Sequence, residues 1–333
     1  ETPKPPKEPE PTVAPTKEPE KEVVKPTTAP EPEETQKPEK TEEPVKTPEP
    51  KTYGWKVSTI KNGINNIDTI QAVPNGVAFS DGNKVYELND NGKLTTIFDA
   101  DEYPYQGTEE LSKRTKVSNK LKTFAYNRND GNIYAIVEQS PHDGNNCDFL
   151  YNITLDETQA NSILCYGQHC YELPSVHNYN LKFYENGDML IGFDPESVRF
   201  NSSGNCIEKY WGYSGTSIIV KDNKNYSHMG RNSGIKNVDC EDTDWEMVDK
   251  FGITYPMAGY EKFYNKSINN EITTLDINGN VGFLLAFDDI DNEEGRSFDL
   301  NQVIQYGAIT DDESKIYFYD NAYGSIRVIE RNK

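Results

Sequence analysis

A hairpin motif that recurs along the second part of the chain constrains the fold most strongly. In each copy an apolar and aromatic run leads into a tight turn of Asn, Asp and Gly, and a second run with period-two alternation follows. The copies, three clear and three weaker, are Val77–Leu88, Phe124–Val137, Leu181–Phe193, Ile218–Tyr226, Ile272–Val281 and Ala308–Tyr319. Asn and Gly accept the positive φ angles that tight hairpin turns require, so each copy predicts two antiparallel strands.

The spacing of these turns favours one repeated architecture. The turn markers are Gly82, Gly131, Gly187, Asn223, Gly279 and Ser314, at intervals of 49, 56, 36, 56 and 35 residues. These intervals lie around the length of a propeller blade, and no long helical periodicity separates the copies. Residues 53–333 therefore resemble an all-β domain with the fold of a β-propeller of about six blades, although no WD, kelch or YWTD signature is present to name a family. Because the intervals are uneven, a two-sheet β-sandwich stays open as the alternative.

The two ends of this domain predict how the fold closes. Three strands are expected near the C-terminus, at 306–310, 315–319 and 325–330, whereas residues 54–60 form a single strand at the start. In a propeller the first strand can complete the last blade and so remove an exposed sheet edge.

Residues 1–52 have a different character from the rest of the chain. They contain 14 of the 20 prolines and no aromatic residue, among Glu, Lys and Thr. Such a segment cannot offset its ordering entropy by apolar burial, and its prolines favour extended conformations. We expect a disordered stalk that carries the single domain at 53–333, outside a cell, either attached to the surface or secreted.

Charge limits the partners of the domain. The net charge of −21 divides into −4 for the stalk, which has 9 Lys and 13 Glu, and −17 for residues 53–333. An acidic surface repels phosphate backbones and anionic lipids, so nucleic acid is not expected as a partner. No apolar stretch has the length for membrane insertion. A monomeric domain that binds a glycan or an extracellular protein is the expectation.

Cysteine spacing gives no metal motif. The five cysteines, Cys147, Cys165, Cys170, Cys206 and Cys240, are an odd number without CxxC spacing. Cys165 and Cys170 flank a loop short enough for a disulfide to close in an oxidising compartment. The pairing of the five stays open.

An acidic run in the sequence suggests one metal site, which would bind Ca²⁺. No other cofactor is expected. Asp288, Asp289 and Asp291 lie in the densest acidic cluster of the chain, after a predicted buried strand. Hard carboxylate oxygens in a loop are ligands that Ca²⁺ prefers, although a solvated acidic loop is the simpler interpretation.

The signatures of common enzymes are absent from the sequence. It contains no HExxH, no phosphate-binding P-loop and no nucleophile elbow followed by a helix. No catalytic residue is predicted. A glycoside hydrolase needs two carboxylates that flank the bond to be cleaved. The candidate pairs for that role are Asp194 with Glu241 and Asp194 with Asp244.

Aromatic residues in polar loops are the most suggestive feature for binding. All 21 Tyr and 3 Trp lie from Tyr53 onward. Sugar rings stack on such side chains, and protein interfaces also favour them. The candidate ligand-binding residues are Tyr103, Tyr105, Tyr210, Trp211, Tyr213 and Trp245.

These observations favour a non-enzymatic recognition or sensor module, of the kind seen in stalked domains of bacterial surface adhesins and membrane-spanning regulators, over an enzyme. That likeness rests on layout alone. A carbohydrate-active hydrolase with paired carboxylates in the central pocket is the alternative, and a scaffold part of a surface assembly is a third.

Overall fold

The computed structural model describes residues 52–102, 117–141, 147–153, 180–193, 196–211, 217–228, 235–237, 251 and 256–333. The chain divides into two units, Glu1–Pro50 and Lys51–Lys333. All described residues belong to the second unit. The predicted stalk lies outside them, apart from Thr52, and its disorder stays a prediction.

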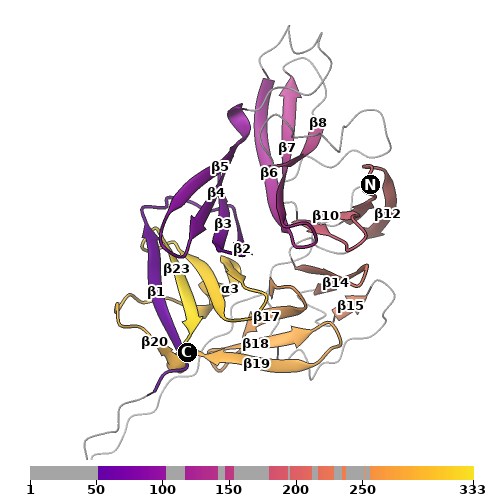
Figure 1. Ribbon diagram of the computed structural model, residues 1–333. Coiled ribbons are helices and arrows are strands. Elements are labelled where there is room, and N and C mark those ends of the chain that lie inside the picture. Colours follow the sequence, from indigo (N-terminus) through magenta and orange to yellow (C-terminus); the bar gives the residue numbers. More distant parts are fainter. Residues whose placement is uncertain are drawn as a thin grey trace, which may run out of the picture. The chain divides into compact units, whose positions relative to one another are not determined.

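The described strands form six sheets, antiparallel except for one short parallel pair (Figure 1). The first three sheets contain β2 (Thr69–Val73), β3 (Gly76–Asp81), β4 (Lys84–Asn89) and β5 (Leu94–Asp99); β6 (Val117–Asn127), β7 (Asn132–Pro141) and β8 (Cys147–Asn152); and β9 (Asn180–Phe183), β10 (Met189–Phe193), β11 (Glu196–Phe200) and β12 (Cys206–Trp211). The next two contain β13 (Ile218–Lys221), β14 (Lys224–His228) and β15 (Ile235–Asn237); and β16 (Met257–Ala258), β17 (Lys262–Lys266), β18 (Glu271–Asp276) and β19 (Val281–Ala286). The last contains β20 (Ile290–Asp291), β1 (Trp55–Asn62), β23 (Ser325–Arg331), β22 (Lys315–Asp320) and β21 (Gly307–Ile309).

The core lies between neighbouring sheets. Six apolar clusters each join one sheet to the next, and together they close a ring. Each cluster has members from two neighbouring sheets; in order around this ring, examples are Phe79 and Tyr319, Ala78 and Phe124, Ile136 and Ile191, Leu190 and Ile218, Ile219 and Phe263, and Leu285 and Ile316. Strands such as β3 are buried on both faces because each face packs against a different neighbour.

This arrangement is a β-propeller. We count five of the six sheets as regular blades. The smallest sheet, β13–β15, has strands of only three to five residues, and we take it to be an incomplete blade. The prediction of a propeller is confirmed, and the sandwich alternative is excluded. The expected number of about six matches the sheets and exceeds the regular blades by one.

The six hairpin turns predicted from the sequence are present at the predicted positions. Each of the six turn markers lies between two strands that pair as a hairpin within one sheet. In the turn between β13 and β14, Asp222 and Asn223 have φ angles of 52° and 56°. Two successive positive φ angles are characteristic of the type I′ turn, whose twist matches that of the flanking strands.

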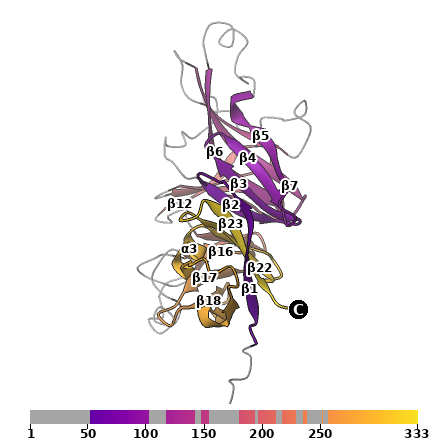
Figure 2. The same cartoon turned by 90° about the vertical axis from the view of Figure 1, so that its left-hand side faces the viewer.

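The predicted closure by the N-terminal strand is also confirmed. β1 pairs antiparallel with β23, from Trp55 opposite Arg331 to Asn62 opposite Ser325. The indigo and yellow strands lie side by side in Figure 1, and Figure 2 shows the same neighbours from another side. Trp55 and Val57 are buried in the cluster that joins this sheet to β16–β19. Closure is therefore held by side-chain packing as well as by backbone hydrogen bonds.

The helical elements whose bounds lie in the described ranges are short, and the sequence did not predict them. These three are η1 (Ala100–Glu102), η3 (Phe287–Asp289) and α3 (Leu300–Gln305). The side chain of Asp299 caps α3 by accepting a hydrogen bond from the backbone N of Asn301 at 2.8 Å. Leu300, Val303 and Ile304 are buried on one face of this helix. A six-residue helix is too short to give a clear periodic signal.

Candidate ligand-binding site

The central channel of the propeller contains a large cavity lined by described residues. It has a volume of about 450 Å³, within the range of small-molecule sites. Its walls come from the edge strands β2, β6, β9, β16 and β21, from Ser217 before β13 and from the end of α3. Since every sheet contributes, this cavity exists only in the closed ring.

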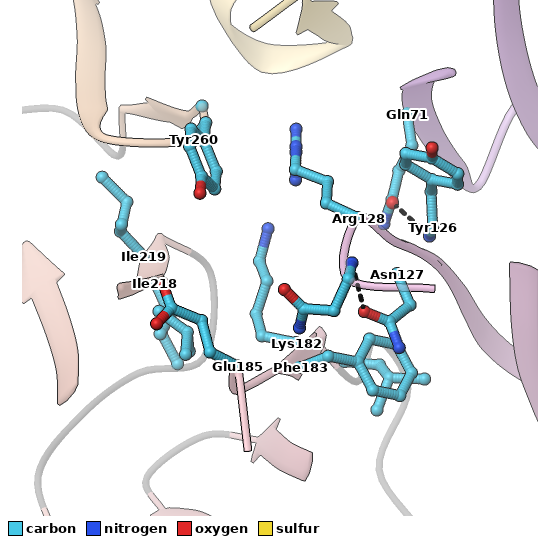
Figure 3. A pocket seen from close by; sticks show the side chains of 14 residues that line it. Gln71, Tyr126, Asn127, Arg128, Lys182, Phe183, Glu185, Ile218, Ile219 and Tyr260 are labelled. Carbon is cyan, nitrogen blue, oxygen red and sulfur yellow. Dashed lines mark hydrogen bonds between the residues drawn. The ribbon is translucent and has the colours of Figure 1, made fainter. Parts of the chain in front are cut away.

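A second, smaller pocket lies where the turns after β6 and β9 meet the start of β17 (Figure 3). It is lined by Gln71, Tyr126, Asn127, Arg128, Asn129, Leu181, Lys182, Phe183, Glu185, Ile218, Ile219, Val220, Gly259 and Tyr260. Three of these residues, Gln71, Arg128 and Lys182, also line the large cavity. We call this shared region the channel mouth.

Arg128 enters the channel mouth from the turn between β6 and β7. Its Nε donates to both carboxylate oxygens of Asp311, at 2.8 and 2.9 Å. Its guanidinium carbon lies 5.3 Å from the centre of the Tyr260 ring, a cation–π distance. Two contacts from separate segments therefore hold this cation in place.

Lys182 lies on β9 and extends toward the space beside Arg128 and Tyr260 (Figure 3). Burial, and after it the nearby charge of Arg128, together lower the pKa of its ammonium to about 8. No hydrogen bond or ion pair reaches the ammonium from the part of the chain that the structure describes. A partly buried cation without a partner is costly, so its position needs an explanation.

Tyr260 is fixed by a third cation. Lys221, at the end of β13, donates to the Tyr260 hydroxyl at 2.7 Å, and its Nζ lies 4.2 Å from the ring centre. Lys221 also forms an ion pair with Glu261 at 2.9 Å. The hydrogen bonds to Tyr260 and Glu261 raise the pKa of Lys221 above its usual value. Unlike Lys182, this lysine has its charge matched by neighbours.

Gln71 joins two sheets at the channel mouth. Its side-chain amide donates to the backbone oxygen of Phe124 at 3.1 Å and accepts from the backbone N of Tyr126 at 2.9 Å. Both ends of the amide are thus used to bind β2 to β6. The role of Gln71 is to fix the wall beside Arg128.

Tyr210 is the one predicted ligand-binding residue whose side chain the structure describes, and it lies in the core. Only 6% of it is exposed, it packs between β9–β12 and β13, and its hydroxyl donates to Glu208 at 2.5 Å. Burial, followed by this hydrogen bond, raises its pKa to about 12. Its ring has no face open to a ligand, because the neighbouring blade covers it.

The other predicted aromatic residues stay predictions. Trp211 is the last residue of β12, and nothing is described of its side chain. Tyr103, Tyr105, Tyr213 and Trp245 lie outside the described residues, as do the carboxylates Asp194, Glu241 and Asp244.

The acidic run after β19 serves to attach the first strand. Asp289 accepts from the backbone N of Gly54 at 3.0 Å, and Glu294 accepts from the backbone N of Thr59 at 2.7 Å. Asp288, Asp289 and Asp291 all lie in the described part of the chain, where no group of three or more potential ligands is placed to hold a metal ion. The structure gives no support for calcium there.

The state of the thiol is described for one cysteine. Cys206, at the start of β12, is a free, partly buried thiol. Cys147 begins β8, and the other three cysteines lie outside the described residues.

Comparisons with known proteins support no more than the fold. No protein-family profile matches the chain, and no curated protein matches it. Similar solved structures include an auxiliary nutrient binding protein from Bacteroides thetaiotaomicron, with 12% identity, a TM-score of 0.45, and coverage of 85% of this chain and 78% of that one. Others are Raptor from Chaetomium thermophilum (13% identity, TM-score 0.49, 85% and 29% covered) and a gluconolactonase from Xanthomonas campestris (9% identity, TM-score 0.45, 84% and 91% covered). These likenesses are too distant to argue a function.

Within the described ranges, no helix has the length and apolar character needed to span a bilayer.

Proposed function

We propose that this protein is an extracellular, non-enzymatic recognition module that binds a glycan at the channel mouth. The observation that carries the proposal is the convergence of Arg128, Lys182 and Gln71 where two cavities meet. Ligand sites in proteins are concave and contain a few polar groups in fixed positions, and this region has both properties. The stalk-like composition of residues 1–52 supports display outside a cell.

The concave shape favours a small polar ligand over a protein partner. Protein interfaces are broad and bury about 800 Å² on each side, whereas the channel mouth admits a few sugar units at most. A protein partner remains the second interpretation, and it would use the aromatic loops that lie outside the described residues.

The lining of the two cavities supports binding over hydrolysis. A glycoside hydrolase needs two carboxylates that flank one bond. Among the described lining residues, Asp68 is the one carboxylate of the large cavity and Glu185 the one of the smaller pocket. Asp68 is also engaged locally, since it accepts from the backbone N of Gly82 at 2.9 Å.

A glycan array probed with the whole chain tests this proposal, with reducing-sugar release measured for every sugar that binds. We expect binding without release. Arg128→Ala should weaken binding because it removes a cation that Asp311 and Tyr260 hold at the mouth. Lys93→Ala is the matched control, since Lys93 is exposed in the turn before β5 and does not line either cavity.

Three results would contradict the proposal. Sugar release would show a hydrolase, and normal binding by Arg128→Ala would place the ligand elsewhere. An array without any bound glycan would favour a protein partner.

A further inference from the structure

The two cations at the channel mouth differ in their pairing. Arg128 and Lys182 are close enough for the charge of Arg128 to disfavour that of Lys182, and Arg128 Nε donates to both carboxylate oxygens of Asp311. Lys182 has no hydrogen bond or ion pair with the described residues, although Glu185 and Asp68 line the cavities beside it. This unpaired lysine belongs to a domain whose net charge is −17, where carboxylates are abundant. A cation left unpaired in such a protein is an unusual and specific feature.

We propose that the ligand is an acidic sugar and that its carboxylate binds between the ammonium of Lys182 and the guanidinium of Arg128. This inference rests on the proposed function, because it names the chemical class of the glycan that the channel mouth accepts. The carboxylate supplies Lys182 with an acceptor for a hydrogen bond, which no described residue provides. A charge-assisted hydrogen bond of this kind is roughly twice as strong as a neutral one.

The number of charges points to an anion with a single negative charge. Asp311 pairs with Arg128, and the single charge of Lys182 is the one that no contact pairs among the described residues. Glu185 lines the same pocket and Asp68 lines the adjoining cavity, so a doubly charged phosphate would be repelled more strongly there than a carboxylate. Tyr126 and Asn129 also line the pocket and are neutral groups suited to sugar hydroxyls.

Binding should depend on pH through Lys182. The charged or titratable groups that line the two cavities beside it are Asp68, Tyr126, Arg128, Glu185, Tyr260 and Tyr306. Lys182 has a pKa of about 8 in the free protein. Its positive charge is therefore present at pH 6 and is lost as the pH rises through about 8. The affinity for an acidic sugar should fall over the same interval, and Lys182→Arg should remove this dependence because arginine stays charged.

The test is a calorimetric titration of the whole chain with three sugars of equal length. They are a galacturonic acid trimer, its neutral methyl ester, and a galactose trimer with one sulfate on each unit. The proteins are the wild type, Lys182→Met, Lys182→Arg and the control Lys93→Met, with circular dichroism to confirm that each is folded. We expect the wild type to bind the galacturonate trimer and Lys182→Met to bind it about 10- to 100-fold more weakly. Lys182→Arg and Lys93→Met should stay within a few-fold of the wild type.

Each other outcome would overturn the inference in an identifiable way. Equal binding of the acid and its methyl ester would show that the charge is not recognised. Preference for the sulfated sugar would replace the carboxylate by another anion. Binding that Lys182→Met leaves unchanged would remove Lys182 from the site. If none of the three sugars binds while neutral glycans bind on the array, the acidic class is wrong and the proposed function stands.

Discussion

Replacing Asp320 by Ala would leave the guanidinium of Arg327 buried without its carboxylate. Both side chains are fully buried, and Arg327 Nη1 lies 3.1 Å from Asp320 Oδ2. Arg327 connects β23 to the segment before α3, since it also donates to the backbone oxygen of Arg296 at 3.2 Å and to Asn292 at 3.3 Å. The pair thus holds the closing sheet together near the strand that joins the two ends of the domain.

The magnitude follows from what remains after the substitution. Breaking a buried ion pair by removing one partner costs about 3–5 kcal/mol, because the other charge stays desolvated. Glu294 lies 3.8 Å from Arg327 Nη2 and compensates part of this charge. We therefore expect about 3 kcal/mol for Asp320→Ala. With a urea slope of about 3 kcal/mol per M, the unfolding midpoint should fall by about 1 M.

Urea unfolding followed by circular dichroism measures this shift on the whole chain. Glu102→Ala, which removes an acidic group from an exposed position in η1, should leave the midpoint unchanged. The double variant Asp320→Leu with Arg327→Met should be more stable than Asp320→Ala, because it leaves neither charge buried. A midpoint shift below about 0.3 M for Asp320→Ala would refute the reasoning, since it would correspond to about 1 kcal/mol or less.

Three further predictions concern stability. Trp55→Ala should lower the free energy of unfolding by about 3–5 kcal/mol, because Trp55 is 3% exposed in the core of the closing sheet. A smaller loss in urea unfolding would show that closure depends on β1 less than the burial of Trp55 indicates. Hydrogen bonds from Thr310 and Ser314 lower the pKa of Asp312 to about 2, so its contribution is fully present above a pH of about 4 and is lost as the pH falls through about 2. The difference in melting temperature between the wild type and Asp312→Asn should shrink over that interval, and a constant difference would contradict this assignment. Asp222→Val should lower the free energy of unfolding by about 1–2 kcal/mol, because the φ of 52° at this position disfavours a branched side chain. Asp222→Gly should leave it unchanged. Equal losses for the two variants in urea unfolding would argue against a strained turn.

Local turn chemistry made much of the fold predictable. A tight turn between strands needs residues that accept positive φ, and Gly82, Gly131, Gly187 and Gly279 have φ angles between 60° and 88°. These residues can be read directly from the sequence, and together with the markers Asn223 and Ser314 they predicted one hairpin for each of the six described sheets. The closing strand was predictable for a related reason, since residues 54–60 had no local partner. The helix α3 was not predictable, because its stability comes from tertiary packing of three apolar residues and not from length.

The candidate site was not predictable in the same way. Arg128, Lys182 and Tyr260 belong to three different sheets or the turns beside them, and ring closure brings them together. One sequence signal was available, because Lys182 follows the buried Leu181 on an edge strand that faces the channel. Using that signal requires knowing which strand of each blade is innermost. Tyr210 was predicted in a loop and lies buried between two sheets, because composition cannot distinguish a ring between blades from a ring in a loop.

The most direct test of the account is an NMR titration of the lysine Cε resonances in the whole chain, with Lys182→Arg used for assignment. The account predicts a pKa of about 8 for Lys182 in the free protein and a rise toward the usual lysine value when the galacturonate trimer is added, because a bound carboxylate favours the charged form. A Lys182 resonance that titrates at the usual value and does not respond to the acidic sugar would contradict the claim that the channel mouth holds an unpaired cation for an anionic ligand.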